Sequence, residues 1–196
     1  MKKLIALSMM LTAGAANAAV LNATVTGSGT YNNDASLLSD GFIPAEGTYW
    51  QDISNVHWTS GGPADFVFDY GADVLLHDIV LSVDNNDDYF VEWSTNNADW
   101  FPLFLIPSAA GNIDEQFPGG MDTFSTISGD VDYLDTLDFA PLTLRYLRLT
   151  AVNGDGAYAA GELQALSAVP LPAAVWLLGG ALLPLAARVK RRQTNV

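Results

Sequence analysis

Oxygen ligands for a metal ion occur at regular spacing in one polar segment of the chain. Asp84, Asn86 and Asp88 match the first, third and fifth positions of a calcium-binding EF-hand loop. The match then fails, because Tyr89 and Thr95 stand where that loop requires glycine and glutamate. The segment is therefore interpreted as a solvated hairpin turn between two strands.

Other side chains suited to catalysis or metal binding are few or scattered. His57 and His77 lack the spacing of a metal-binding pair, so each is expected to be a hydrogen-bonded structural histidine. The chain has no cysteine, which excludes thiol catalysis and thiolate metal sites. Its 22 acidic residues offer many chance pairs for glycoside hydrolysis, but no motif isolates two of them, so an enzyme is not expected.

Charge is concentrated in the middle of the chain. Residues 19–168 contain all 22 acidic residues and only two cations, Arg145 and Arg148, which gives a net charge of −20 before histidine. Such a surface repels phosphate backbones, which argues against nucleic-acid binding, and it makes calcium-holding loops plausible. One arginine is expected to pair with an acid and the other to be exposed.

The elements that must position these side chains are strands. The segment 65–70 alternates, with Phe66, Phe68 and Tyr70 on one face, and Gly71 is expected to end it. Similar runs at 79–83, 89–93, 144–150 and 163–166 are separated by clusters of Asn, Asp, Gly and Pro. This pattern predicts an all-β, antiparallel sandwich or barrel. The stretch 107–132 is interpreted as loop, with a short strand near 123–127.

Both ends of the chain have the character of targeting segments. Lys2 and Lys3, the apolar run 4–15 and the small-residue site 16–18 form a secretory signal pattern over residues 1–18, so the mature chain is expected to begin near Ala19. The apolar stretch 173–187 would make a helix of about 22 Å, a marginal transmembrane helix for a bilayer core of about 30 Å. The basic cluster behind it predicts a cytoplasmic C-terminus; it comprises Arg188, Lys190, Arg191 and Arg192.

The C-terminal segment resembles the PEP-CTERM sorting signals of Gram-negative bacteria. The motif is Val169-Pro170-Leu171-Pro172-Ala173, and the resemblance covers residues 169–192. It implies that the exported protein is held at the inner membrane until an exosortase cleaves near the prolines. Release would then place it at the cell surface, in the outer envelope or in the extracellular matrix. The alternative is an ordinary single-span anchor that is never cut.

Seven local patterns, in order, resemble the discoidin or coagulation factor 5/8 type C domains, which are galactose-binding-like jelly rolls. They are Leu38-Ser39-Asp40-Gly41, Thr48-Tyr49-Trp50, the segment 64–71, Val91-Glu92-Trp93-Ser94, Asp99-Trp100, the segment 145–149 and Gly161-Glu162-Leu163. Tyr70 stands where the family usually has leucine. The resemblance implies a discoidin-like two-sheet jelly-roll sandwich over residues 35–168, preceded by a lead-in at 19–34. Another two-sheet sandwich is the alternative.

The discoidin resemblance also implies a structural calcium ion near the meeting of the first and last strands. By position, its ligands would be Asp40 and Glu162, aided by backbone carbonyls around Leu37 and Phe42 and by Thr48 or its neighbour. Oxygen ligands from distant parts of a chain suit this ion. The alternative is that Asp40 caps a turn and that Glu162 is a solvated charge.

Carbohydrate sites in related modules lie in loops at one end of the sandwich, where aromatic rings cover sugar faces. Tyr49, Trp50, Trp58 and Tyr158 are candidates because their contexts are loop-like, and Trp58 is the first choice. The favoured function is a non-catalytic surface or matrix protein that binds extracellular glycan. The alternatives are a structural or adhesive matrix protein without a sugar site and, less favoured, an extracellular polysaccharide hydrolase.

Overall fold

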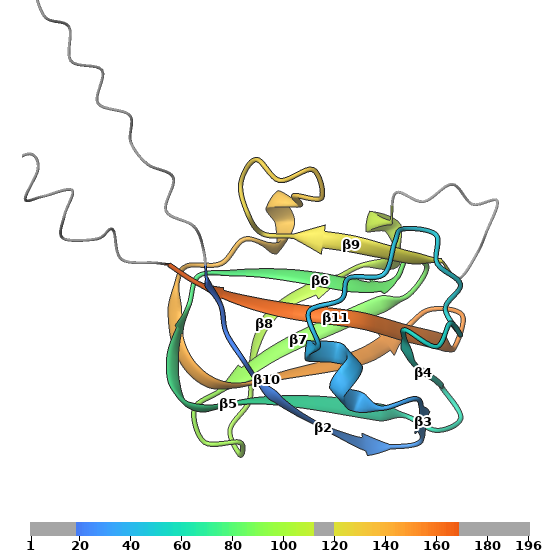
Figure 1. The fold of residues 1–196 in the computed structure, drawn as a ribbon, viewed down its shortest axis with the longest axis horizontal. Helices are drawn as coiled ribbons and strands as arrows, with labels where there is room; N and C mark the ends of the chain where they lie inside the picture. Colours follow the sequence, from blue (N-terminus) through green and yellow to red (C-terminus); the bar gives the residue numbers. More distant parts are fainter. Residues whose placement is uncertain (1–18, 112–119, 169–196) are drawn as a thin grey trace, which may run out of the picture. The chain divides into compact units, whose positions relative to one another are not determined.

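A computed structural model of the chain describes residues 19–111 and 120–168, which form two antiparallel sheets (Figure 1). The first sheet runs in the order β3 (Tyr31–Asn32), β4 (Val56–Thr59), β11 (Ala157–Ser167), β6 (Asp78–Asp84) and β9 (Met121–Ser125), with β1 (Ala19–Val20) also paired to β11. The second runs β2 (Thr24–Gly29), β5 (Ala64–Leu76), β10 (Leu142–Asn153), β7 (Asp88–Ser94) and β8 (Phe101–Ile106). Three short 3₁₀ helices complete the described part: η1 (Ala35–Ser39), η2 (Ser108–Ala110) and η3 (Asp135–Leu137). The predicted all-β antiparallel sandwich is confirmed.

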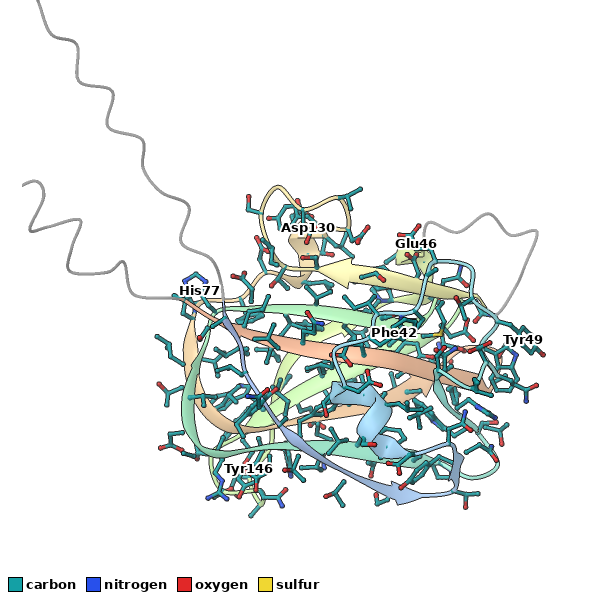
Figure 2. All side chains as sticks on the ribbon, viewed as in Figure 1. Phe42, Glu46, Tyr49, His77, Asp130 and Tyr146 are labelled. Atoms are coloured by element: carbon teal, nitrogen blue, oxygen red, sulfur yellow. The ribbon has the colours of Figure 1, made fainter. Side chains whose placement is uncertain are left out.

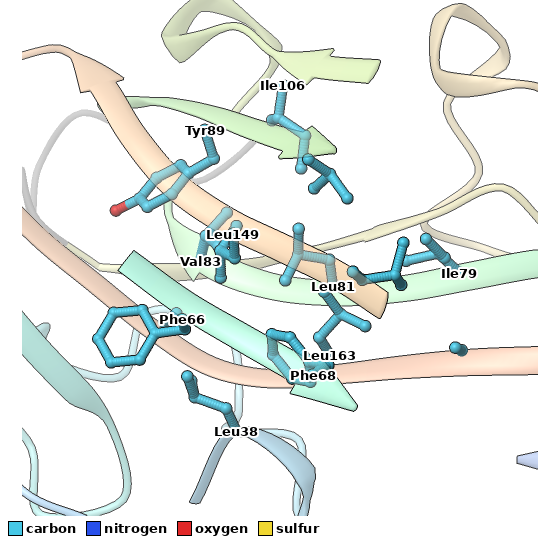
Figure 3. Packing of buried hydrophobic residues seen from close by; sticks show 14 of the residues in the cluster. Leu38, Phe66, Phe68, Ile79, Leu81, Val83, Tyr89, Ile106, Leu149 and Leu163 are labelled. Atoms are coloured by element: carbon cyan, nitrogen blue, oxygen red, sulfur yellow. The ribbon is translucent and has the colours of Figure 1, made fainter. Parts of the chain in front are cut away.

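The core lies between the two sheets and follows the alternation of the sequence. Phe66 and Phe68 of β5 point inward with Leu149 of β10, and they meet Leu81 and Leu163 from the opposite sheet (Figure 3). Because successive side chains of a strand face opposite ways, alternate residues in the first part of β5 and in the middle of β10 are buried, whereas almost every residue of β6 and β11 is buried. Burial of this apolar surface drives the two sheets together.

One strand extends beyond its predicted end. Gly71 was expected to end the strand that begins near Asp65, but β5 continues to Leu76. Gly71 has a φ of +77°, and the β5–β10 register shifts between Leu144 and Tyr146 on the facing strand. A glycine with positive φ therefore creates a bulge here and bends the strand without ending it.

The polar segment 84–88 does not form the predicted solvated hairpin. It joins β6 in one sheet to β7 in the other, so the strands on either side are not paired with each other. Asp84 and Asp87 are each only 1% exposed. The prediction was wrong because a connection that crosses between the sheets passes over the end of the core, where side chains become buried.

The two ends of the sandwich meet in the structure. Ala19 of β1 lies opposite Ser167 of β11, and the backbone N–H of Leu21 donates to the carbonyl of Ala165 at 2.8 Å. Over residues 19–111 and 120–168, no helix has the length and apolar character needed to cross a membrane. The predicted signal peptide, sorting motif, apolar segment and basic cluster lie outside the described residues.

Candidate functional site

A small pocket forms where the beginning and the end of the sandwich meet. It has a volume of about 120 Å³, enough for an ion with several water molecules. Its lining comes from three segments: Val20, Leu21 and Asn22 at the end of β1; Ser39, Asp40 and Gly41 at the end of η1; and Glu162 and Leu163 of β11. The structure thus brings Asp40 and Glu162 to one pocket, as the discoidin resemblance implied.

Local backbone geometry positions the two carboxylates. Oδ1 of Asp40 accepts a hydrogen bond from the backbone N–H of Phe42 at 2.8 Å, which folds the chain into a tight turn. Gly41 has a φ of +87° in this turn, and its backbone N–H donates to Oε1 of Glu162 at 3.2 Å. The β11–β6 pairing shifts register between Ala160 and Glu162. The turn and the bulge together direct both side chains to the pocket.

Glu162 is a buried acid that is only partly compensated by hydrogen bonds. The residue is 2% exposed, Oε1 accepts from Gly41, and Oε2 has no hydrogen-bond partner. Burial raises the pKa of Glu162 to about 7, and the negative charge of Asp40 adds to the shift. A buried carboxylate with a free oxygen and an acidic neighbour needs either a proton or a cation.

The donors at this pocket fit a calcium ion better than a transition metal. No three His, Cys, Asp or Glu side chains of the described segments converge on a point that could hold a metal. The available protein ligands are therefore two carboxylates and peptide carbonyls, and oxygen-only ligation with water is characteristic of calcium.

Leu37, Phe42 and Thr48 themselves do not line the pocket. The implied ligands around Leu37 and Phe42 were backbone carbonyls, and the nearby residues Ser39 and Gly41 do line it. The carbonyl of Thr48 accepts the backbone N–H of Met121 at 2.8 Å, so it belongs to the pairing of this loop with β9. Residues 20–22 line the pocket instead, and sequence reasoning missed them because the discoidin resemblance begins only at residue 35.

The long loop between η1 and β4 displays aromatic side chains at the surface (Figure 2). Tyr49 is 59% exposed, and Trp50 is partly buried. Their ring centroids lie 6.0 Å apart with the planes tilted by 56°, and the Trp50 ring meets His57 edge-on at 5.5 Å. The hydroxyl of Tyr49 donates to Oε1 of Gln51 at 3.3 Å. This arrangement places aromatic and hydrogen-bonding groups side by side on one accessible loop.

A buried asparagine fixes the shape of that loop. Nδ2 of Asn55 donates to the carbonyls of Tyr49 at 3.1 Å and Trp50 at 3.4 Å. The carbonyl of Asn55 in turn accepts from Nδ2 of Asn33 at 2.7 Å. Asn55 is fully buried, and sequence reasoning missed it because its partners are backbone atoms that no motif reveals.

Two of the predicted aromatic ligands belong to the core. Trp58 is 2% exposed and lies within β4, directly opposite Tyr158 of β11. Its ring packs against Phe66 at 5.1 Å, Tyr158 at 5.8 Å and Tyr89 at 6.3 Å. The expectation that Trp58 and Tyr158 lie in exposed loops was wrong, because their flanking polar residues mark the ends of strands whose rings turn inward.

Both arginines of the sandwich are paired. Nε of Arg145 donates to Oδ1 of Asp69 at 2.9 Å, and Nε of Arg148 donates to Oε2 of Glu92 at 2.7 Å. The Arg148 guanidinium also lies 4.4 Å from the centroid of the Trp100 ring. The expected pairing with an acid holds for both arginines, and Arg145 keeps 37% of its side chain exposed. Because both are paired in this way, neither cation neutralises Glu162 or the buried acids of the segment 84–88.

Comparison with known proteins gives structural neighbours only. No family model and no curated protein matches the sequence. One neighbour is the family 32 CBM of Clostridium perfringens NanJ in complex with galactose (17% identity, TM-score 0.45, 73% of this chain and 93% of that chain). Another is chitosan-binding module 1 of a Paenibacillus chitosanase/glucanase (15%, 0.45, 75% and 96%). A third is the CBM32 of AlyQ in complex with 4,5-unsaturated mannuronic acid (13%, 0.48, 76% and 99%).

Proposed function

We propose that this chain is an exported, non-catalytic β-sandwich protein that binds extracellular glycan. The observation that carries the proposal is the presentation of Tyr49 and Trp50 by a loop whose shape the buried Asn55 fixes. Aromatic rings cover the apolar faces of sugars, and neighbouring polar groups bind the hydroxyls. A loop that is already ordered loses little conformational entropy on binding, which favours affinity.

The glycan proposal is tested by binding of the full chain to a glycan array and to bacterial exopolysaccharide. Tyr49→Ala removes the exposed ring and is expected to weaken binding about tenfold, equivalent to ~1.4 kcal/mol. Phe101→Ala is the matched control, because Phe101 is 49% exposed but lies on β8 in the other sheet. Equal losses in both variants, or no glycan bound by the wild type, would contradict the proposal.

The second candidate function is a structural or adhesive matrix protein without a sugar site. It draws support from apolar groups on β8, where the Phe101 ring lies 5.0 Å from that of Trp93 with the planes tilted by 31° and Leu105 is also exposed. Binding to matrix protein that Phe101→Ala weakens and Tyr49→Ala leaves intact would favour this alternative. Release of sugar from exopolysaccharide would instead identify a hydrolase.

Export and sorting form a separate part of the proposal that rests on the sequence. A signal peptide over residues 1–18 would direct export, and the motif 169–173 would present the tail to an exosortase before release from the inner membrane. Mass spectrometry of the cell-surface protein is expected to find an N-terminus near Ala19 and a C-terminus near the prolines. A Pro170→Ala/Pro172→Ala variant should keep its tail and remain in the membrane fraction. An intact tail in the wild type would indicate a permanent anchor.

A structural calcium ion in the pocket of Asp40 and Glu162 completes the proposal. The unpartnered Oε2 of Glu162 and the adjoining carboxylate supply the charge that such an ion needs. The ion would bridge the segment after β1, the turn after η1 and β11, and so would hold the two ends of the sandwich together. Calcium here has a structural role and does not contact the proposed glycan loop at Tyr49.

A further inference from the structure

The turn between β6 and β7 carries four buried side-chain oxygens that lack a hydrogen-bond partner. They are Oδ1 and Oδ2 of Asp84, Oδ1 of Asn86 and Oδ2 of Asp87. A carboxylate loses its hydration when it is buried, and without donors or a counter-charge the ionised form is strongly disfavoured. No cation among the described residues pairs with Asp84, and the nearby backbone N–H of Asn85 offsets only part of the effect of burial, so the place of Asp84 in the fold requires an explanation.

The surroundings of these acids add negative charge. Burial raises the pKa of Asp84 to about 8, and the carboxylates of Asp87 and Asp155 raise it further. Burial likewise raises the pKa of Asp87 to about 7. The only cations in residues 19–168, Arg145 and Arg148, are paired with other acids. Backbone N–H groups of Asn85, Asp155 and Gly156 offset part of the charge of this turn, but neither arginine of the described residues pairs with it.

The loop between β10 and β11 closes over the same turn. The backbone N–H of Asp155 donates to Oδ1 of Asp87 at 2.9 Å, and Nδ2 of Asn86 donates to Oδ2 of Asp155 at 3.2 Å. Gly154 approaches so closely that a Cβ atom there would lie 1.7 Å from Oδ1 of Asp87. These contacts fix the side chains of Asn86 and Asp87, and burial confines that of Asp84, which is the preorganisation that an ion site requires.

We propose that the β6–β7 turn, closed by the β10–β11 loop, is a second calcium site, distinct from the pocket of Asp40 and Glu162. The ligands are the carboxylates of Asp84 and Asp87 and the amide oxygen of Asn86, with water completing the shell. All of these donors are oxygen, which favours calcium over zinc or copper. The ion joins the connection between the two sheets to the neighbouring loop, and it supplies the charge that Asp84 and Asp87 lack.

Calorimetric titration of the full chain with calcium, after treatment with chelator, tests this site. The wild type is expected to bind two ions, Asp84→Asn/Asp87→Asn one, Glu162→Gln one and the triple variant none. Asp65→Asn is the control, because it removes one acid from an exposed position on β5. Stoichiometry that is unchanged in Asp84→Asn/Asp87→Asn would overturn the second site. A single ion that disappears only in Asp84→Asn/Asp87→Asn would support it and refute the pocket at Glu162.

Thermal unfolding provides a readout that does not depend on stoichiometry. In chelator, Asp84→Asn is expected to raise the Tm, because the amide does not impose a buried charge. In calcium, the same variant is expected to lose most of the ion-induced rise in Tm that the second site contributes. If Asp84→Asn instead lowers the Tm in chelator and keeps the full calcium response, protonated Asp84 stabilises the fold without an ion. That result would overturn the proposal.

Discussion

The backbone N–H of Gly41 donates to Oε1 of Glu162 at 3.2 Å, a hydrogen bond between residues 121 positions apart in the sequence. It leaves Oε2 of the same carboxylate buried and without a partner beside Asp40. One oxygen of Glu162 therefore ties the turn after η1 to β11, and the other is available to a cation. A single side chain combines a packing role with the proposed ion-binding role.

Glu162→Gln separates these two roles. Glutamine keeps an oxygen that can accept from Gly41, but it removes the charge that a calcium ion requires. Above pH 7 and in chelator, the variant is expected to be more stable than the wild type by about 1–2 kcal/mol, because a buried ionised acid is removed. In the presence of calcium, the wild type should instead be more stable than the variant. Urea unfolding in both conditions measures this, and a wild type that calcium does not stabilise more than the variant would refute the ion at this pocket.

Three of the buried acids, Asp84, Asp87 and Glu162, give the metal-free protein a distinctive pH dependence. The pKa values of Glu162 and Asp87 are raised to about 7 and that of Asp84 to about 8, from ordinary values near 4. At pH values between about 4 and 7–8, these three carboxyl groups are protonated in the native state but ionised in the unfolded chain. The free energy of unfolding should therefore fall as the pH rises from about 4.5 to 8, by ~1.4 kcal/mol per pH unit for each group that titrates.

Calcium should oppose this loss of stability. A calcium ion replaces the protons on the carboxylates. At pH 8, calcium is therefore expected to restore most of the lost free energy of unfolding, whereas at pH 5 it should change that free energy only slightly. Denaturant unfolding at several pH values, with calcium or with chelator, provides the measurement. Stability that rises with pH in chelator, or that calcium leaves unchanged at pH 8, would contradict the account of these acids.

Alternation in the sequence was sufficient to predict the central strands. Phe66, Phe68 and Tyr70 recur every second residue, with Asp65 and Asp69 on the opposite face, which is the signal of a strand with one buried face. β8 gave no such signal, because Pro102 interrupts it and a register shift in its pairing with β7 breaks the alternation. β2 was missed for a related reason, since Gly27 and Gly29 leave it with few apolar side chains.

The sites were only partly predictable because they depend on contacts between distant segments. Asp40 and Glu162 were paired through the discoidin resemblance, whereas their spacing alone carries no information. Asp84 was assigned to solvent because aspartate in a polar segment usually lies in a turn, and its burial follows from the crossing between sheets. Trp58 was assigned to an exposed loop because its neighbours in the sequence are polar, but it lies near the end of β4 with its ring in the core.

Asn55→Ala should disturb the proposed glycan loop from below. The substitution removes the donors to the carbonyls of Tyr49 and Trp50 and leaves a small buried void. The expected loss of stability is about 1–3 kcal/mol, and glycan binding should weaken because the rings are no longer preorganised. Urea unfolding and glycan binding below the unfolding transition measure both effects. Unchanged glycan affinity in a measurably destabilised variant would show that the loop does not carry the glycan site.

Substitution of Trp58 distinguishes a core residue from a sugar ligand. Trp58→Ala is expected to destabilise the fold by about 3–5 kcal/mol, because it empties a site packed by Phe66, Tyr89 and Tyr158. Trp58→Phe retains most of the apolar contact and should cost less, while leaving glycan affinity at the wild-type value. Thermal unfolding and glycan binding of the phenylalanine variant provide the test. A folded Trp58→Phe protein that fails to bind glycan, while Tyr49→Ala binds normally, would move the site from the surface loop to the interior end of the sandwich.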